Sequence, residues 1–206
     1  MDFLSWIQVL TICVLGAMSP GPSLAVVLRN TVRGGKRQGM LTGIGHGLGV
    51  FFYAGLVVTG LAVALAAAPQ IEIVVSYAGI VLLIWLGYSF IGFNRPVPVE
   101  KQPEVVISGR SGFVSGFLIS FLNPKIAAFF LALFSPFLRA EAGWTEKAIL
   151  AMTAGTVDTV WYVLVALVLS GSAMTKMLEK HSVTIERMIG CFLLFLAAAF
   201  VYRLWA

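Results

Sequence analysis

Long apolar stretches separated by short polar gaps make up almost the whole chain of 206 residues. A helix needs about 20 mostly apolar residues to cross the hydrocarbon layer of a bilayer. Lipid offers the backbone no hydrogen-bond partner, so spanning segments of this kind are helical. The pattern therefore predicts an all-α, polytopic membrane protein with six transmembrane helices. The six stretches are residues 4–28, 40–67, 71–93, 113–137, 148–170 and 187–205.

The gaps between these stretches predict how the helices are grouped. Only Pro69 and Gln70 separate the second stretch from the third, which indicates a tight antiparallel hairpin. The longest gap, residues 94–112, combines three prolines with several charges and is typical of a solvated linker. We therefore expect two three-helix repeats, residues 1–93 and 113–206, joined by a cytoplasmic linker. An odd number of crossings gives the repeats opposite orientations, which makes them inverted.

The composition excludes an ordinary soluble domain. Apolar residues make up 59% of the chain and charged residues 11%, whereas soluble domains contain about 45–50% and about 25%. The mean hydropathy is +0.95. The formal charge of +5 is scattered through short gaps and forms no basic stripe with interleaved aromatics, so we expect a lipid bilayer as partner and no nucleic acid.

The basic residues predict the orientation, because Lys and Arg in short loops stay in the cytoplasm. Three residues lie in or beside the even-numbered gaps and the C-terminus: Arg139, Lys147 and Arg203. Ten lie in the odd-numbered gaps or at their ends: Arg29, Arg33, Lys36, Arg37, Arg95, Lys101, Arg110, Lys176, Lys180 and Arg187. This distribution predicts both termini outside the cytoplasm. No basic residue precedes Arg29, so the first stretch does not resemble a secretory signal peptide.

Two stretches contain residues that interrupt a helix near their middle. In the first, Pro20, Gly21 and Pro22 follow one another within residues 19–23. In the fourth, Asn123 and Pro124 occupy the matching place. Proline removes a backbone donor and clashes with the preceding turn. These breaks are either simple proline kinks or, as a matched pair in the two repeats, parts of a substrate site.

Lys125 and Asp158 are charged residues near the centres of the fourth and fifth stretches. Each costs about 2.5–3.5 kcal/mol to insert at mid-membrane. They either form a structural ion pair with each other or border a polar cavity, where they could bind the two ends of a zwitterion or carry a proton. Trp161 and Tyr162 follow Asp158 at helical spacing, so they either line that cavity or pack.

Glycines open the second stretch, and Gly39, Gly43 and Gly47 recur every four residues. Such a stripe lets a second helix approach closely, either inside the molecule or in a homo-oligomer. His46 lies within this segment and could relay protons or hydrogen-bond a loop. Whether His46 or Glu72 joins a proton path stays open.

Several of these residues together resemble the LysE/RhtB family of bacterial amino-acid exporters. The shared segments are residues 18–22, the basic turn 33–39 and residues 123–125, followed by two phenylalanines. The resemblance spans nearly the whole chain. It implies a multi-pass carrier in the inner membrane that exports amino acids or related metabolites and is energised by the proton gradient. Asp158 matches the family's aspartate in the fifth span.

The residues and the resemblance together favour alternating access by two inverted repeats. Lys125 would bind the substrate's carboxylate, and Asp158 would bind its amino group or the antiported proton. We favour a neutral amino acid as substrate. The alternatives are a passive channel, a structural subunit or a membrane-embedded enzyme. An enzyme would need a catalytic set, and Cys13 and Cys191 form no CxxC pair, so we expect no catalytic residues, metal or cofactor.

Overall fold

The computed structural model describes residues 1–19, 21–68, 72–92, 112–135, 137, 142–168 and 172–205. These ranges contain helices and turns but no strand, which confirms the all-α prediction. The helices are α1 (Phe3–Met18), α2 (Pro22–Ala67), α3 (Glu72–Ile91), α4 (Gly112–Phe121), α5 (Pro124–Phe134), α6 (Trp144–Val168) and α7 (Ser172–Trp205). The Pro69–Gln70 hairpin and most of the 94–112 linker lie outside the described residues.

Four of the described helices are long and apolar enough to cross a membrane: α2, α3, α6 and the part of α7 from Val183 to Tyr202. Helices α4 and α5 form a bent pair with an angle of 59° that can act as one span. Helix α1 has only 16 residues and is shorter than a full span. The count of six crossings therefore stays a prediction.

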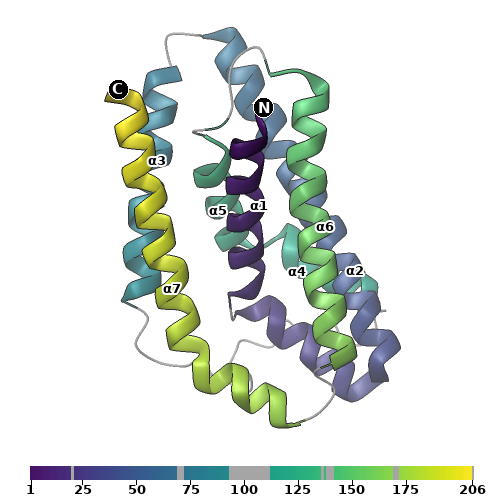
Figure 1. The fold of residues 1–206 in the computed structure, drawn as a ribbon. Coiled ribbons are helices and arrows are strands. Elements are labelled where there is room, and N and C mark those ends of the chain that lie inside the picture. Colours follow the sequence, from purple (N-terminus) through teal and green to yellow (C-terminus); the bar gives the residue numbers. More distant parts are fainter. Residues whose placement is uncertain are drawn as a thin grey trace.

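Helix α2 changes direction at Gly35, where the sequence predicted a basic gap. This glycine has φ 75° and ψ 174°, a left-handed conformation that a residue without Cβ adopts at little cost. Residues 22–34 therefore form a short helical segment that turns directly into the long segment 36–67 (Figure 1). The first predicted stretch is consequently divided between α1 and the start of α2.

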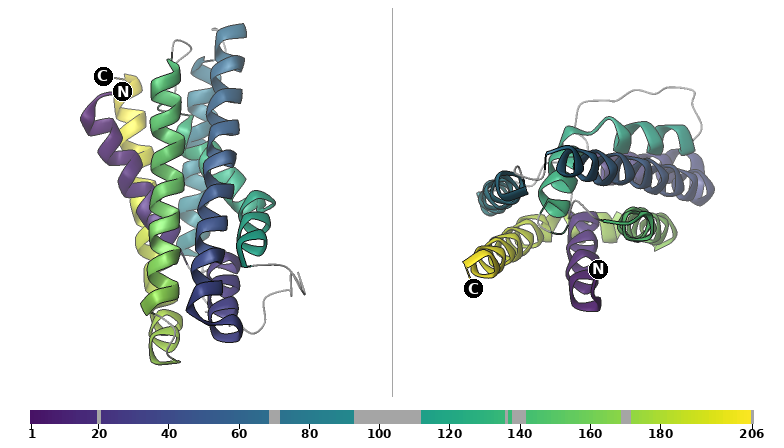
Figure 2. Two further views of the ribbon diagram at one scale, coloured as in Figure 1. Left: turned by 90° about the vertical axis from the view of Figure 1, so that its right-hand side faces the viewer. Right: turned by 90° about the horizontal axis from the view of Figure 1, so that it is seen from above.

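Seen from above, the helices form two rows, with α4 packed along the outer side of α2 (Figure 2). One row contains α7, α1 and α6, and the other contains α3, α5 and α2. Between the rows, α2 packs against α6 and α3 packs against α7. Buried side chains of both rows, including Ile12, Leu83 and Leu193, form the main hydrophobic core. Both termini lie at the same end of the molecule (Figure 1).

The glycine stripe of α2 makes its contact inside the molecule. A Cβ added at Gly39, Gly43 or Gly47 would meet atoms of α6, and one added at Gly155 of α6 would meet the Gly47 carbonyl. The backbones of α2 and α6 therefore approach closely at Gly47 and Gly155, as small residues allow. Of the two uses predicted for this stripe, the structure supports the internal one.

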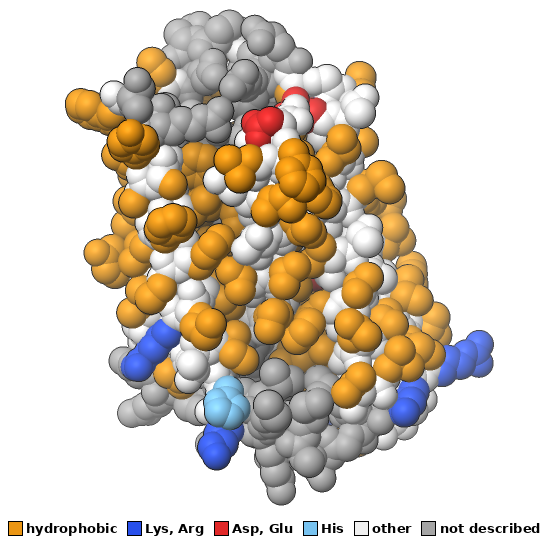
Figure 3. Space-filling view, viewed as in Figure 1, with side chains coloured by type: hydrophobic (Ala, Val, Ile, Leu, Met, Phe, Trp, Pro, Cys, Tyr) orange, Lys and Arg blue, Asp and Glu red, His pale blue; other side chains and the backbone are white. Residues whose placement is uncertain are grey.

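The outer surface is apolar over its middle, as contact with lipid requires. Large hydrophobic side chains such as Phe52, Leu56, Trp85 and Phe195 are 49–69% exposed. On the face drawn in Figure 3, acidic side chains lie near the end that carries the termini, and Lys and Arg lie near the opposite end. The distribution divides this face into an apolar band with one acidic and one basic border.

Candidate substrate site

Two helix N-termini face one cavity at the predicted breaks. Helix α1 ends at Met18, and α2 begins with Gly21 as its cap and Pro22 in its first turn. Helix α5 begins in the same way, with Asn123 as cap, and the Asn123 side chain accepts a 2.9 Å hydrogen bond from the backbone N–H of residue 125. Proline suits the first turn of a helix because its missing N–H would have no partner there. The local sequence thus ends one helix and starts another at each break.

The cavity between these breaks has a volume of about 630 Å³ including its mouth. Its apolar wall includes Val50, Phe90, Ile126, Phe129 and Phe130. Its polar wall consists of residues from α2, α5, α6 and the two breaks: Ser19, Ser23, His46, Asn123, Lys125, Asp158 and Tyr162. A concave, mostly apolar wall with a few convergent polar groups is typical of small-molecule sites.

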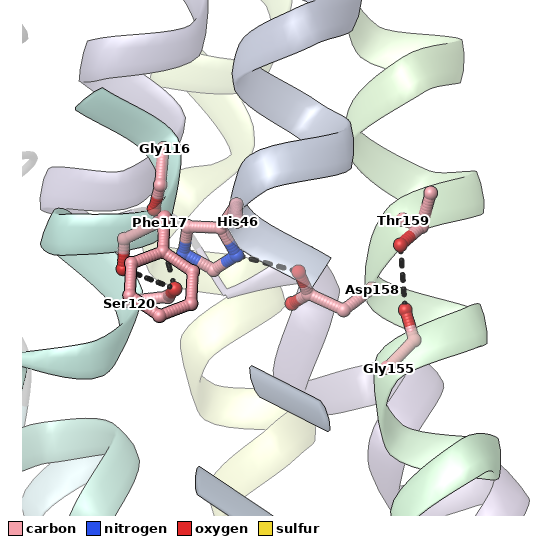
Figure 4. A network of polar contacts seen from close by, with 7 residues as sticks. All are labelled: His46, Gly116, Phe117, Ser120, Gly155, Asp158 and Thr159. Atoms are coloured by element: carbon pink, nitrogen blue, oxygen red, sulfur yellow. Dashed lines mark hydrogen bonds and ion pairs between the residues drawn. The ribbon is translucent and has the colours of Figure 1, made fainter. Parts of the chain in front are cut away.

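On one side of the cavity, Asp158 of α6 is paired with His46 of α2. The distance from His46 Nδ1 to Asp158 Oδ2 is 2.5 Å, and the two residues are 1% and 8% exposed. Figure 4 shows the imidazole between α4 and α6 with Nδ1 toward the carboxylate. The His46 ring also contacts the Tyr162 ring at 4.6 Å between centroids. Tyr162 and Ser23 both line this cavity.

On the other side of the cavity, Lys125 of α5 is paired with Glu186 of α7. Ser19, at the first helix break, forms a hydrogen bond with each of them. The Lys125 ammonium donates a 3.1 Å hydrogen bond to Ser19 Oγ, and Ser19 donates one of 2.9 Å to Glu186 Oε1. Lys125 Nζ lies 3.9 Å from the same Glu186 oxygen and 4.5 Å from the centre of the Phe90 ring. The Lys125 side chain is 47% exposed, whereas that of Glu186 is 2% exposed.

The two charges predicted from the sequence therefore border the same cavity with different partners. Lys125 and Asp158 do not form the structural ion pair that the sequence allowed, because Asp158 lies beside His46 and Lys125 lies beside Glu186. The alternative that His46 serves only to hydrogen-bond a loop is also wrong, because its partner lies within α6. The side chain of Glu72 lies outside the described residues.

The other predicted site residues divide into three groups. Gly21, Pro22, Asn123 and Tyr162 line the cavity. Trp161 instead packs against the cluster that α2 and α6 form on the side of Leu24 and Leu28, because one residue along a helix turns the side chain by about 100°. Pro20 and the side chain of Pro124 lie outside the described residues.

Glu186 is the buried charge that the sequence reasoning missed. The predicted sixth span began at residue 187, but α7 is helical from Ser172 onward. A usable signal was helical periodicity, because Glu186 lies three and seven residues before Ile189 and Leu193, both 1% exposed. Residues at this spacing share a helix face. A carboxylate on a buried face needed a partner.

The arrangement can bind a small molecule that carries both charges. Lys125 offers ammonium donors, and Asp158 offers a carboxylate acceptor. Among the described residues, His46 Nε2 and Glu186 Oε2 are buried and have no hydrogen-bond partner, so both atoms can take part in a rearranged network. The described residues contain no group of three or more His, Cys, Asp or Glu side chains that could hold a metal.

The chain is similar to bacterial membrane proteins named as transporters. Residues 14–204 match the family described as LysE type translocator. The threonine efflux protein of Escherichia coli strain K12 is 28% identical over 78% of this chain and 80% of its own length. The leucine efflux protein of Salmonella choleraesuis is 27% identical over 76% and 74%, respectively. No solved structure matches the chain.

Proposed function

Because this chain belongs to the LysE type translocator family, we propose that it exports amino acids or related small metabolites across the bacterial inner membrane in exchange for protons. The names of the threonine and leucine efflux relatives support an amino-acid cargo. The observation that carries the proposal is the cavity at two helix breaks, bordered by Lys125 and Asp158. A buried polar cavity of this kind needs a polar occupant to offset the cost of its charges.

In this proposal the substrate's carboxylate binds Lys125, and its amino group binds Asp158. Lys125 suits this role because its side chain is 47% exposed and is therefore open to a ligand. The N-termini of α2 and α5 also face the cavity, and half-helix N-termini favour an anionic group. The aromatic and aliphatic wall near Phe129 then receives the side chain of a neutral amino acid.

Alternating access would come from two inverted three-helix repeats within residues 1–93 and 113–206. The packing pattern supports this division. With α1 matched to α4 and α2 matched to α6, exchanging the repeats turns the contact of α1 with α6 into that of α4 with α2. The exchange leaves two contacts unchanged, that of α2 with α6 and that of α3 with α7. Close glycine contacts lie at both of these crossings, Gly47 with Gly155 and Gly87 with Gly190.

The proton gradient would supply the energy. One proton that moves through about 150 mV provides about 3.5 kcal/mol, which supports a concentration ratio of a few hundredfold. The basic border in Figure 3 lies opposite the end that carries the termini. This supports a cytoplasmic position for the basic border and an outer position for both termini.

The experiment that tests the proposal measures amino-acid efflux from vesicles that contain wild-type protein or Asp158→Asn. We expect wild-type protein to move an amino acid against its gradient when protons flow the other way. We expect Asp158→Asn to lose this coupling. Glu146→Gln is the matched control, because Glu146 lies in the first turn of the same helix and pairs with the N-terminal amine at 3.6 Å.

Two results would contradict the proposal. Unchanged, proton-dependent export by Asp158→Asn would remove Asp158 from the coupling role. Wild-type flux that is only downhill and does not saturate would favour a passive channel instead.

A further inference from the structure

His46 is placed where it can exchange a proton with the cavity. It lines the cavity, its Nδ1 lies 2.5 Å from Asp158 Oδ2, and its side chain is 1% exposed. Its Nε2 is buried and has no partner among the described residues. Imidazole is the side chain whose charge changes most readily between about pH 5 and 8.

Asp158 needs a positive partner, because a buried carboxylate without one is strongly unfavourable. In the structure His46 Nδ1 lies beside Asp158, where a protonated imidazole would supply this partner. The amino group of a bound amino acid would supply the same charge from the cavity side. Both cations need hydrogen bonds to a single carboxylate that is only 8% exposed, so binding of one disfavours binding of the other.

We propose that His46 carries the exchanged proton and that the imidazolium competes with the substrate's amino group for Asp158. This inference rests on the proposed function and assigns its proton site. When the ammonium group hydrogen-bonds Asp158, the Nδ1–H bond of His46 breaks and its electron pair stays on Nδ1. The proton leaves through water in the cavity. Asp158 faces one positive group before and after the exchange. The substrate's carboxylate joins Lys125 and Glu186, so the net charge of the cavity falls by one when the proton leaves.

The direction of transport follows from this competition. An amino acid that enters from the cytoplasm releases the proton to the cytoplasm. A proton that enters from the more acidic outside recharges His46 and displaces the amino acid outward. One proton enters for each zwitterion exported, and one positive charge therefore moves inward in each cycle.

The surroundings of His46 contain few other groups that could replace it. Helix α4, which packs against α2, contains no titratable residue. Lys125 and Glu186 already form a pair of opposite charge. Among the described residues, the titratable groups that line the cavity with His46 are Asp158 and Tyr162 from α6, Cys13 from α1 and Lys125 from α5. Glu186 of α7 reaches this group through its pair with Lys125.

The first test uses purified wild-type protein in weakly buffered detergent solution with a pH-sensitive dye. L-leucine, L-threonine and L-lysine are added separately, and thermal stabilisation identifies those that bind. We expect each amino acid that binds to release up to one proton per molecule bound. The release should be largest at the pH values where His46 starts protonated. Binding without any proton release would overturn the assignment, and this result does not depend on a variant.

The second test compares His46→Gln with wild-type protein in proteoliposomes. Exchange of labelled for unlabelled amino acid should persist in His46→Gln, because Asp158 still binds the amino group. Accumulation driven by an acidic lumen should be lost, whereas wild-type protein should accumulate about tenfold for each pH unit. His181→Gln is the control and should behave as wild type, because His181 is the chain's other histidine and is exposed.

The outcomes separate this inference from the proposed function. Accumulation by His46→Gln in response to the pH gradient would overturn the role of His46 while leaving the exporter proposal in place. If none of the 20 standard amino acids stabilises the wild-type protein or crosses with it, the exporter proposal fails and the proton assignment fails with it.

Discussion

Asp158 and Glu186 are both buried carboxylates, but only Asp158 lines the cavity, whereas Glu186 contacts the lining residues Ser19 and Lys125. Asp158 lies 2.5 Å from an imidazole nitrogen. Glu186 accepts a hydrogen bond from Ser19 and lies 3.9 Å from the ammonium group of Lys125. Imidazole loses its charge near neutral pH, whereas lysine carries a compact charge on a flexible stem. The comparison separates an acid suited to proton exchange from an acid suited to holding a cation in place.

The two pairs also connect different parts of the molecule. The His46–Asp158 pair joins α2 to α6 at their close glycine contact. The Lys125–Glu186 pair joins the start of α5 to α7 through Ser19 at the end of α1. The first pair lies where α2 crosses α6, and the second fixes one helix break against the other. We therefore expect the Glu186 side to contribute mainly to stability and to the position of Lys125.

The largest effect should come from Lys125→Met, which leaves Glu186 buried without its cation. Breaking a buried pair by removing one partner costs about 3–5 kcal/mol. Because Lys125 is 47% exposed, we expect a loss near the lower end, about 3 kcal/mol. A lower apparent melting temperature in detergent would measure it.

The matched control for this prediction is the double variant Lys125→Met with Glu186→Gln. It removes the second charge as well, so much of the lost stability should return. If the double variant is as unstable as Lys125→Met alone, the loss comes from packing against Phe90 and not from an unpaired carboxylate.

From the sequence, Asp158 was easier to recognise as a buried site residue than Glu186. Asp158 lies in the middle of an apolar stretch, where any charge demands an explanation. Glu186 lies beside Arg187 at the edge of an apolar stretch, where charges are ordinary. Only the continuation of α7 back to Ser172 shows that Glu186 is within a helix. A hydropathy pattern locates apolar stretches. It does not show whether a helix continues beyond such a stretch into polar residues.

The pairing of charges could not be predicted for a related reason. Lys125 and Asp158 lie at similar depths in their stretches, so depth alone allowed an ion pair between them. The partner of each depends on how the helices are rotated and on which backbones approach closely. The packing of Gly47 against α6 brings His46 to Asp158. The breaks were predictable, because proline at the start of a helix has a local cause.

The next largest effect is a pH dependence of amino-acid binding, which should distinguish Asp158 from Glu186. If protons compete with the substrate at Asp158, amino-acid binding should weaken up to about tenfold per unit as the pH falls from 8 to 6. Glu186→Gln should keep this dependence, whereas Asp158→Asn should bind weakly at both pH values with little difference between them. Calorimetric titration at the two pH values checks this. A pH dependence that disappears in Glu186→Gln and persists in Asp158→Asn would reverse the assignment of the two acids.

The smallest effect should come from Ser19→Ala, which removes the hydroxyl between Lys125 and Glu186. Its loss should cost about 1 kcal/mol, because one hydrogen bond is removed on each side. This cost should shrink in a Glu186→Gln background and persist in an Asp158→Asn background, since coupled residues are non-additive and separate ones add. Ser23→Ala, which removes a different hydroxyl from the cavity wall, should show no coupling to Glu186. Equal coupling of Ser19 to both carboxylates, measured by thermal unfolding, would show that the two sides of the cavity form one network.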